Sequence, residues 1–181
     1  METPTNAISQ SVSQQAQAAF VAGDHAEALS LLKQAIETDP NHPTWGLDLA
    51  RMTFQTGRLA KAKAILASLP KSQRTTHEAK TLSTLFQFSE IIADAPEMNN
   101  LKDTLQQNPN HLESLYQLAA YWMLHHQIEK AMDCLLQSIR FDKTDRGGRA
   151  QQLLLAIFTL LQDDHPQQIN AYRRQLQGIL F

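Results

Sequence analysis

The sequence predicts an all-α fold built from repeated helix hairpins, and three observations indicate it. Ala, Leu and Gln, which favour helices, are abundant, whereas valine occurs only at Val12 and Val21. Six glycines and seven prolines among 181 residues are few for the many turns of a β-rich chain. Small and aliphatic residues also recur at helical spacing about every 34 residues, the period of a repeat array.

An alanine is followed by a leucine one helical turn later in three segments. The pairs are Ala28–Leu32, Ala62–Leu66 and Ala131–Leu135. Residues four apart share one face of a helix. The alanine lets a neighbouring helix approach to the short end of the usual range of roughly 8–10 Å, and the leucine fills the space beside it. We therefore expect each pair to lie in the contact between two helices.

Glycine and proline mark the ends of the helices. Gly23 and Gly57 stand where a first helix must turn, and glycine adopts the left-handed conformation of such a turn without strain. Pro40 and Pro109 follow second helices, because proline disfavours helical geometry at the residue before it. This alternation predicts hairpins of two helices each.

The expected helices pair into about five hairpins that form a single domain over residues 1–181. Their approximate bounds are 8–22, 26–38, 43–56, 59–69, 75–93, 97–107, 111–125, 128–141, 146–162 and 166–180. The repeats run over about 8–42, 43–74, 75–110 and 111–144, with a C-terminal hairpin at 145–181. Such short helices are marginal in water, so stacking on neighbours must stabilise them.

The charge and the cysteine content exclude several classes of protein. Lys and Arg total 16 against 18 for Asp and Glu, a formal net charge of −2. No large positive field attracts nucleic acid or an anionic membrane, so neither is expected as a partner. Cys134 is the only cysteine and excludes an internal disulfide. We interpret it as a small core residue rather than a redox nucleophile.

No targeting or membrane segment is predicted. The N-terminal residues have neither the basic start nor the apolar stretch of a secretory signal. The most apolar run, residues 153–161, has about half the length needed to span a bilayer. These features predict a cytoplasmic protein.

The repeat pattern resembles the tetratricopeptide repeat, a right-handed α-solenoid of helix pairs whose first helices line a concave groove. The resemblance is carried by the alanine–leucine pairs and the glycine and proline stops. His126 stands where the family has glycine, and Lys143 where it has the closing proline. The resemblance implies a scaffold that binds proteins.

The first helices of the hairpins supply the residues expected to face the groove. These are Asp48, Arg51, Gln55, Leu82, Phe86, Glu90, Tyr116, Gln117 and Met123. Aromatic and methionine side chains there would adapt to varied apolar clients. The alternative is that Phe86, Tyr116 and Met123 pack against adjacent hairpins.

The C-terminal third resembles the repeat half of the chaperedoxins, bacterial co-chaperones that fuse a thioredoxin-like domain to tetratricopeptide repeats. The matching residues are Asp145, Arg149, Leu154, Ile157, Phe158, Leu161, Pro166, Tyr172, Arg173, Arg174, Leu176 and Leu180. The thioredoxin-like half has no counterpart in this chain. The resemblance implies a non-catalytic module that binds unfolded clients, the chaperonin, or both, with a thioredoxin-like domain upstream in the full-length protein. The alternative is a repeat scaffold that assembles an unrelated bacterial complex.

The last helix is a second candidate for docking. Its apolar and basic residues are Tyr172, Arg173, Arg174, Leu176, Ile179, Leu180 and Phe181. An apolar helix end can dock into a groove on a partner, and in the family this end is associated with the chaperonin. The alternative is that the helix folds back onto the preceding hairpin.

Catalytic and metal sites are not predicted. His42 and His111 occupy equivalent turns, so duplication of the repeat accounts for both. His125 and His126 are adjacent and diverge on a helix, unlike a metal-binding pair spaced by four. No phosphate loop or nucleophile motif is present, so we expect no enzymatic activity and no cofactor.

Overall fold

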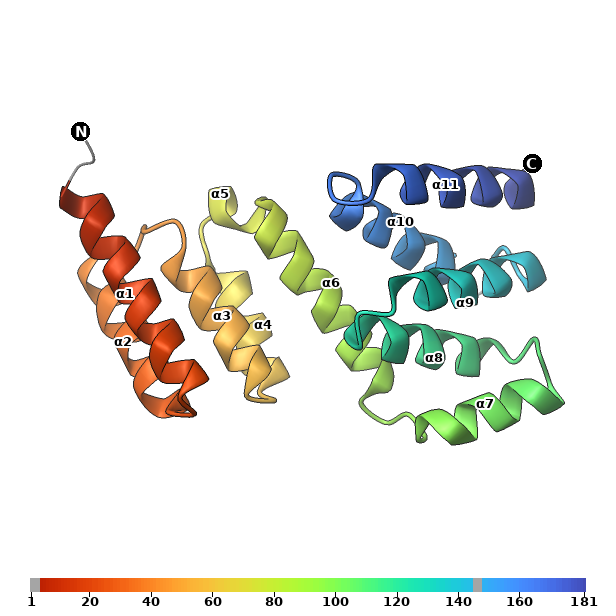
Figure 1. Cartoon of the computed structure of the whole chain (residues 1–181), viewed down its shortest axis with the longest axis horizontal. Coiled ribbons are helices and arrows are strands. Elements are labelled where there is room, and N and C mark those ends of the chain that lie inside the picture. The colour runs from red at the N-terminus through yellow and green to blue at the C-terminus, as the bar shows by residue number, and fades with distance from the viewer. Residues whose placement is uncertain (1–3, 145–147) are drawn as a thin grey trace. The chain divides into compact units, whose positions relative to one another are not determined.

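The described part of the chain is all-α, which confirms the predicted fold class. The computed structural model describes residues 4–144 and 148–181, with side chains from residue 12 onwards, and contains no strand in those ranges. Figure 1 shows the helices along the chain. They are α1 (Pro4–Val21), α2 (His25–Thr38), α3 (Trp45–Gln55), α4 (Leu59–Ser68), α5 (Lys71–Arg74), α6 (His77–Ile92), α7 (Met98–Gln107), α8 (Leu112–Leu124), α9 (Ile128–Phe141), α10 (Arg149–Leu161) and α11 (Pro166–Leu180).

Every predicted helix has a counterpart, and one short helix was not predicted. Asp145 and the expected start of the ninth helix lie outside the described residues. The additional helix, α5, has a single turn, too short to give a hydrophobic period. Its buried Gln73 donates from Nε2 to the carbonyl oxygens of Asn41 and His42 at 3.3 and 3.1 Å. The short helix therefore closes the loop between α2 and α3.

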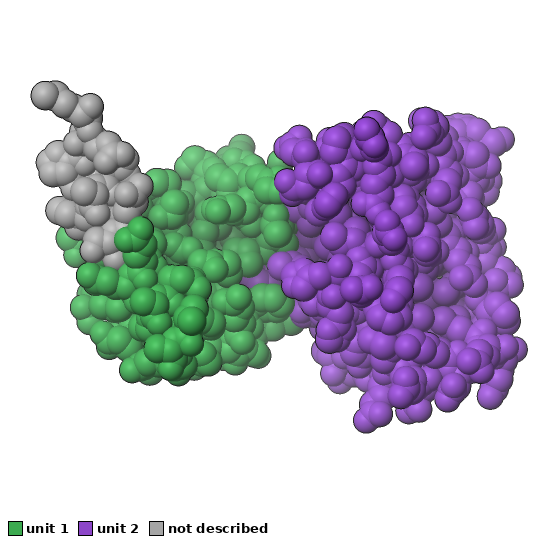
Figure 2. All heavy atoms as spheres, viewed as in Figure 1, with its two compact units in different colours: residues 1–82 green, residues 83–181 purple. Residues whose placement is uncertain are grey.

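The chain divides into two compact units, and the single domain expected over residues 1–181 stays a prediction. Unit 1 ends at Leu82 and unit 2 runs over Ser83–Phe181, as Figure 2 colours them. The division falls inside α6, which is not among the closely packed helix pairs of the described residues. Helix α6 has buried residues on both sides of this division, with Ala79 and Leu82 in unit 1 and Phe88 and Ile91 in unit 2.

In unit 1, two hairpins pack side by side. Helix α1 pairs with α2 and α3 with α4, while α2 also contacts α3. A core forms where they meet, with Ala28, Leu32 and Met52 fully buried in it. Close contact between α1 and α2 requires the small residue at position 28.

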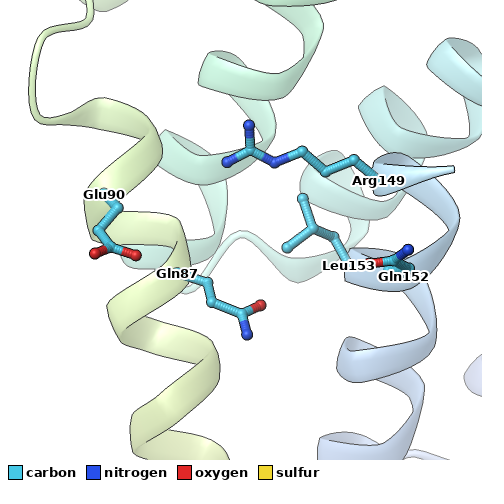
Figure 3. A pocket seen from close by; sticks show the side chains of 5 residues that line it. All are labelled: Gln87, Glu90, Arg149, Gln152 and Leu153. Carbon is cyan, nitrogen blue, oxygen red and sulfur yellow. The ribbon is translucent and has the colours of Figure 1, made fainter. Parts of the chain in front are cut away.

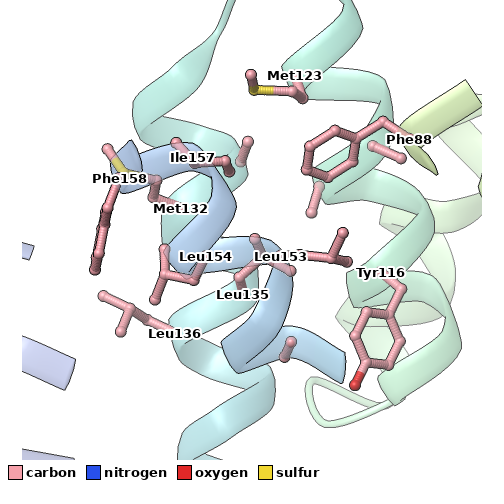
Figure 4. Packing of buried hydrophobic residues seen from close by; sticks show 14 of the residues in the cluster. Phe88, Tyr116, Met123, Met132, Leu135, Leu136, Leu153, Leu154, Ile157 and Phe158 are labelled. Carbon is pink, nitrogen blue, oxygen red and sulfur yellow. The ribbon is translucent and has the colours of Figure 1, made fainter. Parts of the chain in front are cut away.

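Unit 2 contains the larger core. Helix α8 pairs with α9, α7 packs on α8, and α10 and α11 pack on α9. Figure 4 shows aromatic and aliphatic side chains of α6, α8, α9 and α10 meeting at the centre of this unit. Phe88, Leu135, Leu154 and Phe158 are all fully buried there or nearly so.

The predicted alanine–leucine pairs lie in helix contacts, with one exception. Ala28, Ala62 and Ala131 have no exposed surface, nor do Leu32 and Leu135. Leu66 is only partly buried, so the expectation of an equivalent core position is wrong there. The physical reason is that, within unit 1, α4 packs closely on α3 alone, which leaves part of the α4 surface uncovered in that unit.

Three equivalent turns close the first helices in the same way. Gly23, Gly57 and His126 all have left-handed backbones, with φ of 89°, 77° and 58°. At Gly57 the amide donates to the carbonyl of Phe54, and the next amide donates to the carbonyl of Thr53. The amides of His126 and the residue after it make the matching bonds to the carbonyls of Met123 and Trp122. The histidine thus occupies the position of the missing glycine.

Replacing His126 with glycine is expected to raise the free energy of unfolding by about 0.5–1 kcal/mol. A side chain in the left-handed region costs roughly 1–2 kcal/mol, so its removal stabilises the folded chain by about that amount. Glycine loses more chain entropy on folding, which offsets about 0.5–1 kcal/mol of this stabilisation. Chemical denaturation of wild type and His126→Gly measures the change. The reverse exchange, Gly57→His, serves as control and should lower stability; a destabilised His126→Gly would contradict the assigned turn.

Candidate protein-binding surface

A polar network joins the first helices of unit 1. The carboxylate of Asp48 accepts from Nη2 of Arg51 at 2.8 Å through Oδ1 and from Oγ of Ser13 at 3.0 Å through Oδ2. Both terminal nitrogens of Arg51 also donate to Oε1 of Gln17 at 3.5 Å. Predicted residues Asp48 and Arg51 therefore lie together, and Gln55 follows on the exposed surface of α3.

The charges of this network balance each other. Asp48 uses both oxygens within the chain, and its partner Arg51 carries the compensating charge. The ion pair spans positions i and i+3 of α3, and its arginine is 40% exposed. Such a pair contributes little to stability and leaves a neutral, polar surface.

Unit 2 contains a cleft of about 320 Å³ between α6 and α10. Its lining residues are Gln87, Glu90, Arg149, Gln152 and Leu153. Figure 3 shows the guanidinium of Arg149 reaching from α10 towards α6, where Gln87 and Glu90 project from one face. The guanidinium also lies 5.8 Å from the ring of Tyr116, a cation–π contact that restricts its position.

The cleft offers both kinds of hydrogen-bonding group. The amides of Gln87 and Gln152 donate and accept, Glu90 accepts, and Arg149 only donates. Leu153 adds an aliphatic side chain. Because each peptide group carries one donor and one acceptor, these side chains suit an extended backbone lying between the two helices.

The structure separates the predicted groove residues into two sets. Glu90 lines the cleft and Gln117 is partly buried. The other predicted groove residues of α6 and α8 are buried, namely Leu82, Phe86, Tyr116 and Met123. Tyr116 and Met123 belong to the core of unit 2, so the packing alternative holds for them and they offer little accessible surface. Their size makes them fill space between hairpins.

Sequence reasoning missed most of the cleft. Gln87 lies three residues before Glu90, and this spacing puts both on one face of a helix. Arg149, Gln152 and Leu153 have the same relation on the first helix of the last hairpin. That spacing was the signal that could have placed them, because the first helix of every hairpin contributes to the same surface of a repeat array.

The last helix folds back onto its own unit. Ile169 and Leu176 are buried against the preceding helices. Tyr172 donates from its hydroxyl to Oδ1 of Asp133 at 2.8 Å. Burial is the main cause that raises the pKa of this phenol, and the carboxylates of Asp133 and Glu129 add to it. Gln168 donates to Oε1 of Glu129 at 2.6 Å. The fold-back alternative is therefore realised along most of α11.

A small part of the predicted docking helix stays exposed. Arg174 and Phe181 lie on the surface, whereas Ile179 and Leu180 are partly buried. Arg173 is exposed but lies 5.7 Å from the ring of Phe158. Any docking through this helix would depend on Arg174 and Phe181, which stay candidates.

Cys134 packs against the core of unit 2. Burial, and secondly the charge of Asp133, raise the pKa of its thiol from 9.0 to about 12. The raised pKa disfavours the thiolate of Cys134, which is the reactive form of cysteine. Burial and pKa therefore agree with a core residue rather than a redox nucleophile.

Alkylation of Cys134 is expected to be at least about tenfold slower in the folded chain than in the denatured chain at pH 8, because burial raises the pKa of the thiol and shields its sulfur from the reagent. Mass spectrometry after timed iodoacetamide treatment measures it. Equal rates in the two states would show that the thiol is accessible and ionised.

The two histidines of the equivalent turns make different contacts, and His111 alone of the two caps the helix that follows it. Nδ1 of His111 lies 3.3 Å from the amide nitrogen of Ser114, which donates to it, and 2.8 Å from the serine hydroxyl. His42 does not cap α3, whose N-cap is Thr44; its Nδ1 accepts from the amide nitrogen of Thr44 at 3.5 Å. Within the described residues no group of three or more His, Cys, Asp or Glu side chains is arranged to hold a metal ion. No helix among them is long and apolar enough for a membrane span.

The hairpins stack through buried alanines, and a polar cleft lies between two of their first helices. These features are typical of helical-repeat proteins that serve as binding scaffolds. Two family models, each described as a tetratricopeptide repeat, match residues 19–85 and 92–181 and together cover most of the chain. The chain belongs to the tetratricopeptide-repeat family. Repeats of this family are in general non-catalytic and bind other proteins, which makes this chain a protein–protein interaction module.

One curated relative is the cellulose synthase operon protein C of Pseudomonas fluorescens (strain SBW25). It is 29% identical over 133 residues, which are 72% of this chain and 10% of that protein. The chain therefore spans about a tenth of the length of this relative.

Two solved structures of bacterial proteins align with most of this chain. A domain of VP0806, a protein of unknown function from Vibrio parahaemolyticus, is 22% identical with a TM-score of 0.41, over 95% of this chain and 99% of that one. TTC0263, a thermophilic tetratricopeptide-repeat protein of Thermus thermophilus, is 17% identical with a TM-score of 0.43, over 95% and 99%.

Proposed function

We propose that this chain is a non-catalytic binding module that holds an extended segment of a partner protein in the cleft between α6 and α10. The observation that carries the proposal is the set of amide and charged groups on the two facing helices, Gln87 and Glu90 opposite Arg149 and Gln152. Side-chain amides pair with a peptide backbone whatever its sequence. The aliphatic Leu153 adds contact with apolar side chains of the partner.

The finer proposal is a cytoplasmic co-chaperone module that binds unfolded clients. Backbone-directed chemistry in the cleft supports it, because an unfolded chain exposes its peptide groups. The residues that resemble the chaperedoxins give less support, since Leu154, Ile157, Phe158 and Leu176 are buried. Apolar residues at these four positions are explained by the packing of a helix hairpin alone. A chaperonin contact and an upstream thioredoxin-like domain belong to this proposal and rest on the resemblance alone.

The second candidate is a scaffold that assembles a bacterial complex. Similarity to a protein of a cellulose synthase operon favours this candidate. A scaffold of this kind would hold one defined partner rather than many unfolded chains. The two candidates therefore differ in whether a permanently unfolded protein binds.

A permanently unfolded probe tests the proposal directly. We would titrate the chain with a reduced and carboxymethylated model protein and, in parallel, with the same protein in its native fold. The double variant Gln87→Ala/Gln152→Ala removes two amides of the cleft, and Gln175→Ala on the exposed surface of α11 is the matched control. Two hydrogen bonds of about 1 kcal/mol each predict a loss of affinity of roughly tenfold or more.

Each result decides one part of the proposal. Binding of the unfolded form alone, weakened by the double variant but not by Gln175→Ala, would support the co-chaperone module. Failure of the unfolded form to bind would reject the co-chaperone role. Equal binding by wild type and double variant would reject the cleft.

The contact with the chaperonin is tested separately on α11. Deleting the helix would uncover Ile169 and Leu176, so point variants are the cleaner test. Arg174→Glu and Phe181→Ser change only exposed side chains. Loss of co-elution with purified chaperonin in these variants is expected, and no co-elution of the wild type would end the assignment.

A further inference from the structure

A second cleft lies on α7, α8 and α9 of unit 2. It has a volume of about 350 Å³ and is lined by Lys102, Leu105, Gln106, Pro109, Leu118 and Gln137. Nε2 of Gln137 donates to the carbonyl oxygen of Pro109 at 2.6 Å, which ties α9 to the loop between α7 and α8. This bond holds one wall of the cleft in place.

Two lysines gather around one tryptophan next to this cleft. Nζ of Lys102 lies 5.1 Å from the ring centroid of Trp122, and Nζ of Lys130 lies 4.5 Å from it. Neither lysine has a carboxylate within salt-bridge distance among the described residues. Because Lys102 also lines the cleft, the pair of positive charges and the cleft form one continuous surface.

This surface is separate from the cleft between α6 and α10. Leu118 and Trp122 lie four residues apart and share a face of α8. About 200° of helix rotation separates Leu118 from Tyr116, on whose ring Arg149 of the first cleft lies. The two clefts are therefore on opposite sides of α8.

We propose that the surface formed by the second cleft, Trp122 and Lys130 is a docking site for an acidic protein segment that carries aliphatic side chains. Carboxylates of the segment pair with Lys102 and Lys130. An aliphatic side chain of the segment enters between Leu105 and Leu118. The proposal is independent of what the first cleft binds.

The chemistry favours a protein segment over other polyanions. Leu105, Pro109 and Leu118 give the cleft an apolar lining, which a phosphate backbone does not use. Only two lysines are unpaired here, and the whole chain has a formal net charge of −2. A nucleic acid or an anionic membrane needs a larger positive field for stable binding.

The test is a titration with a fluorescent synthetic peptide of glutamates and leucines, followed by anisotropy. The comparison peptide has glutamine at every glutamate. We expect the glutamate peptide to bind at about 50 mM salt and to weaken several-fold at about 200 mM, as screening of charge pairs requires. We expect the glutamine peptide to bind at least tenfold more weakly.

Charge reversal locates the site. Lys102→Glu/Lys130→Glu should reduce affinity for the glutamate peptide at least tenfold. Lys33→Glu/Lys80→Glu makes the same change of net charge at exposed lysines elsewhere and should alter affinity less than twofold. Gln87→Ala/Gln152→Ala should leave this binding unchanged, which separates it from the proposed function. Circular dichroism checks that the variants stay helical.

Three results with the peptides would overturn the proposal, and a fourth comes from other polyanions. They are no binding of the glutamate peptide, equal binding of the glutamine peptide, and equal loss in both lysine double variants. Tighter binding of single-stranded DNA or of anionic lipid vesicles through Lys102 and Lys130 would also overturn it, since the partner would then not be a protein.

Discussion

Leu135→Ala is expected to lower the free energy of unfolding of unit 2 by about 2–5 kcal/mol. Leu135 has no exposed surface and lies at the centre of the core that α8, α9 and α10 share. Truncation removes apolar contacts and leaves a cavity that the surrounding helices fill only partly. The effect should be confined largely to unit 2, since repeat helices depend mainly on their neighbours.

The matched control is Leu66→Ala, the equivalent position of an earlier repeat. Leu66 is only partly buried, so its truncation should cost no more than about 1.5 kcal/mol. The chain has two tryptophans, Trp45 in unit 1 and Trp122 in unit 2. Urea titration of 5-fluorotryptophan-labelled protein by ¹⁹F NMR therefore follows each unit separately. Equal losses at the two leucines would contradict the packing described for α4 and α9.

Ala131→Leu is expected to destabilise unit 2 by about 1–3 kcal/mol. Ala131 has no exposed surface and sits where α9 meets its neighbours. A larger side chain there must push the helices apart or adopt a strained rotamer. The added side chain gains little from burial, because Ala131 is already fully covered by its neighbours.

Ala67→Leu on α4 is the control for this substitution. Ala67 is exposed, so leucine there should change the free energy of unfolding by less than about 0.5 kcal/mol. Thermal and chemical denaturation of both variants measure the difference. A neutral Ala131→Leu would show that the alanine does not set the distance between the helices.

The helices and their ends could be predicted because their signals are local. Gly23 and Gly57 require a left-handed turn, and the paired Ala28 and Leu32 mark a buried face, whatever lies beyond the hairpin. Leu49–Ala50 and Leu118–Ala119 recur in the first helices of two hairpins, and each pair is buried to the same degree. The one-turn helix α5 gives no period, so nothing in the sequence indicated it.

The candidate site could be predicted only in part because burial between helices is not local. Tyr116 and Met123 are on a first helix, but which side of it faces the next hairpin depends on how the hairpins pack. An apolar stripe such as Ile169 and Leu176 serves equally for docking or for folding back. The i,i+3 spacing puts Arg149 and Gln152 on one face of α10, but that this face lies at the cleft depends on the packing of α10 against α9.

Site-specific photo-cross-linking in native cells tests the central claim most directly, namely that the chain holds a partner protein between α6 and α10. A photoreactive phenylalanine analogue replaces Gln152 in this cleft, and Gln175 on the exposed surface of α11 is the matched control. We predict a discrete protein adduct at Gln152 and none at Gln175. Adducts of equal yield at both positions, or none at Gln152, would contradict the claim.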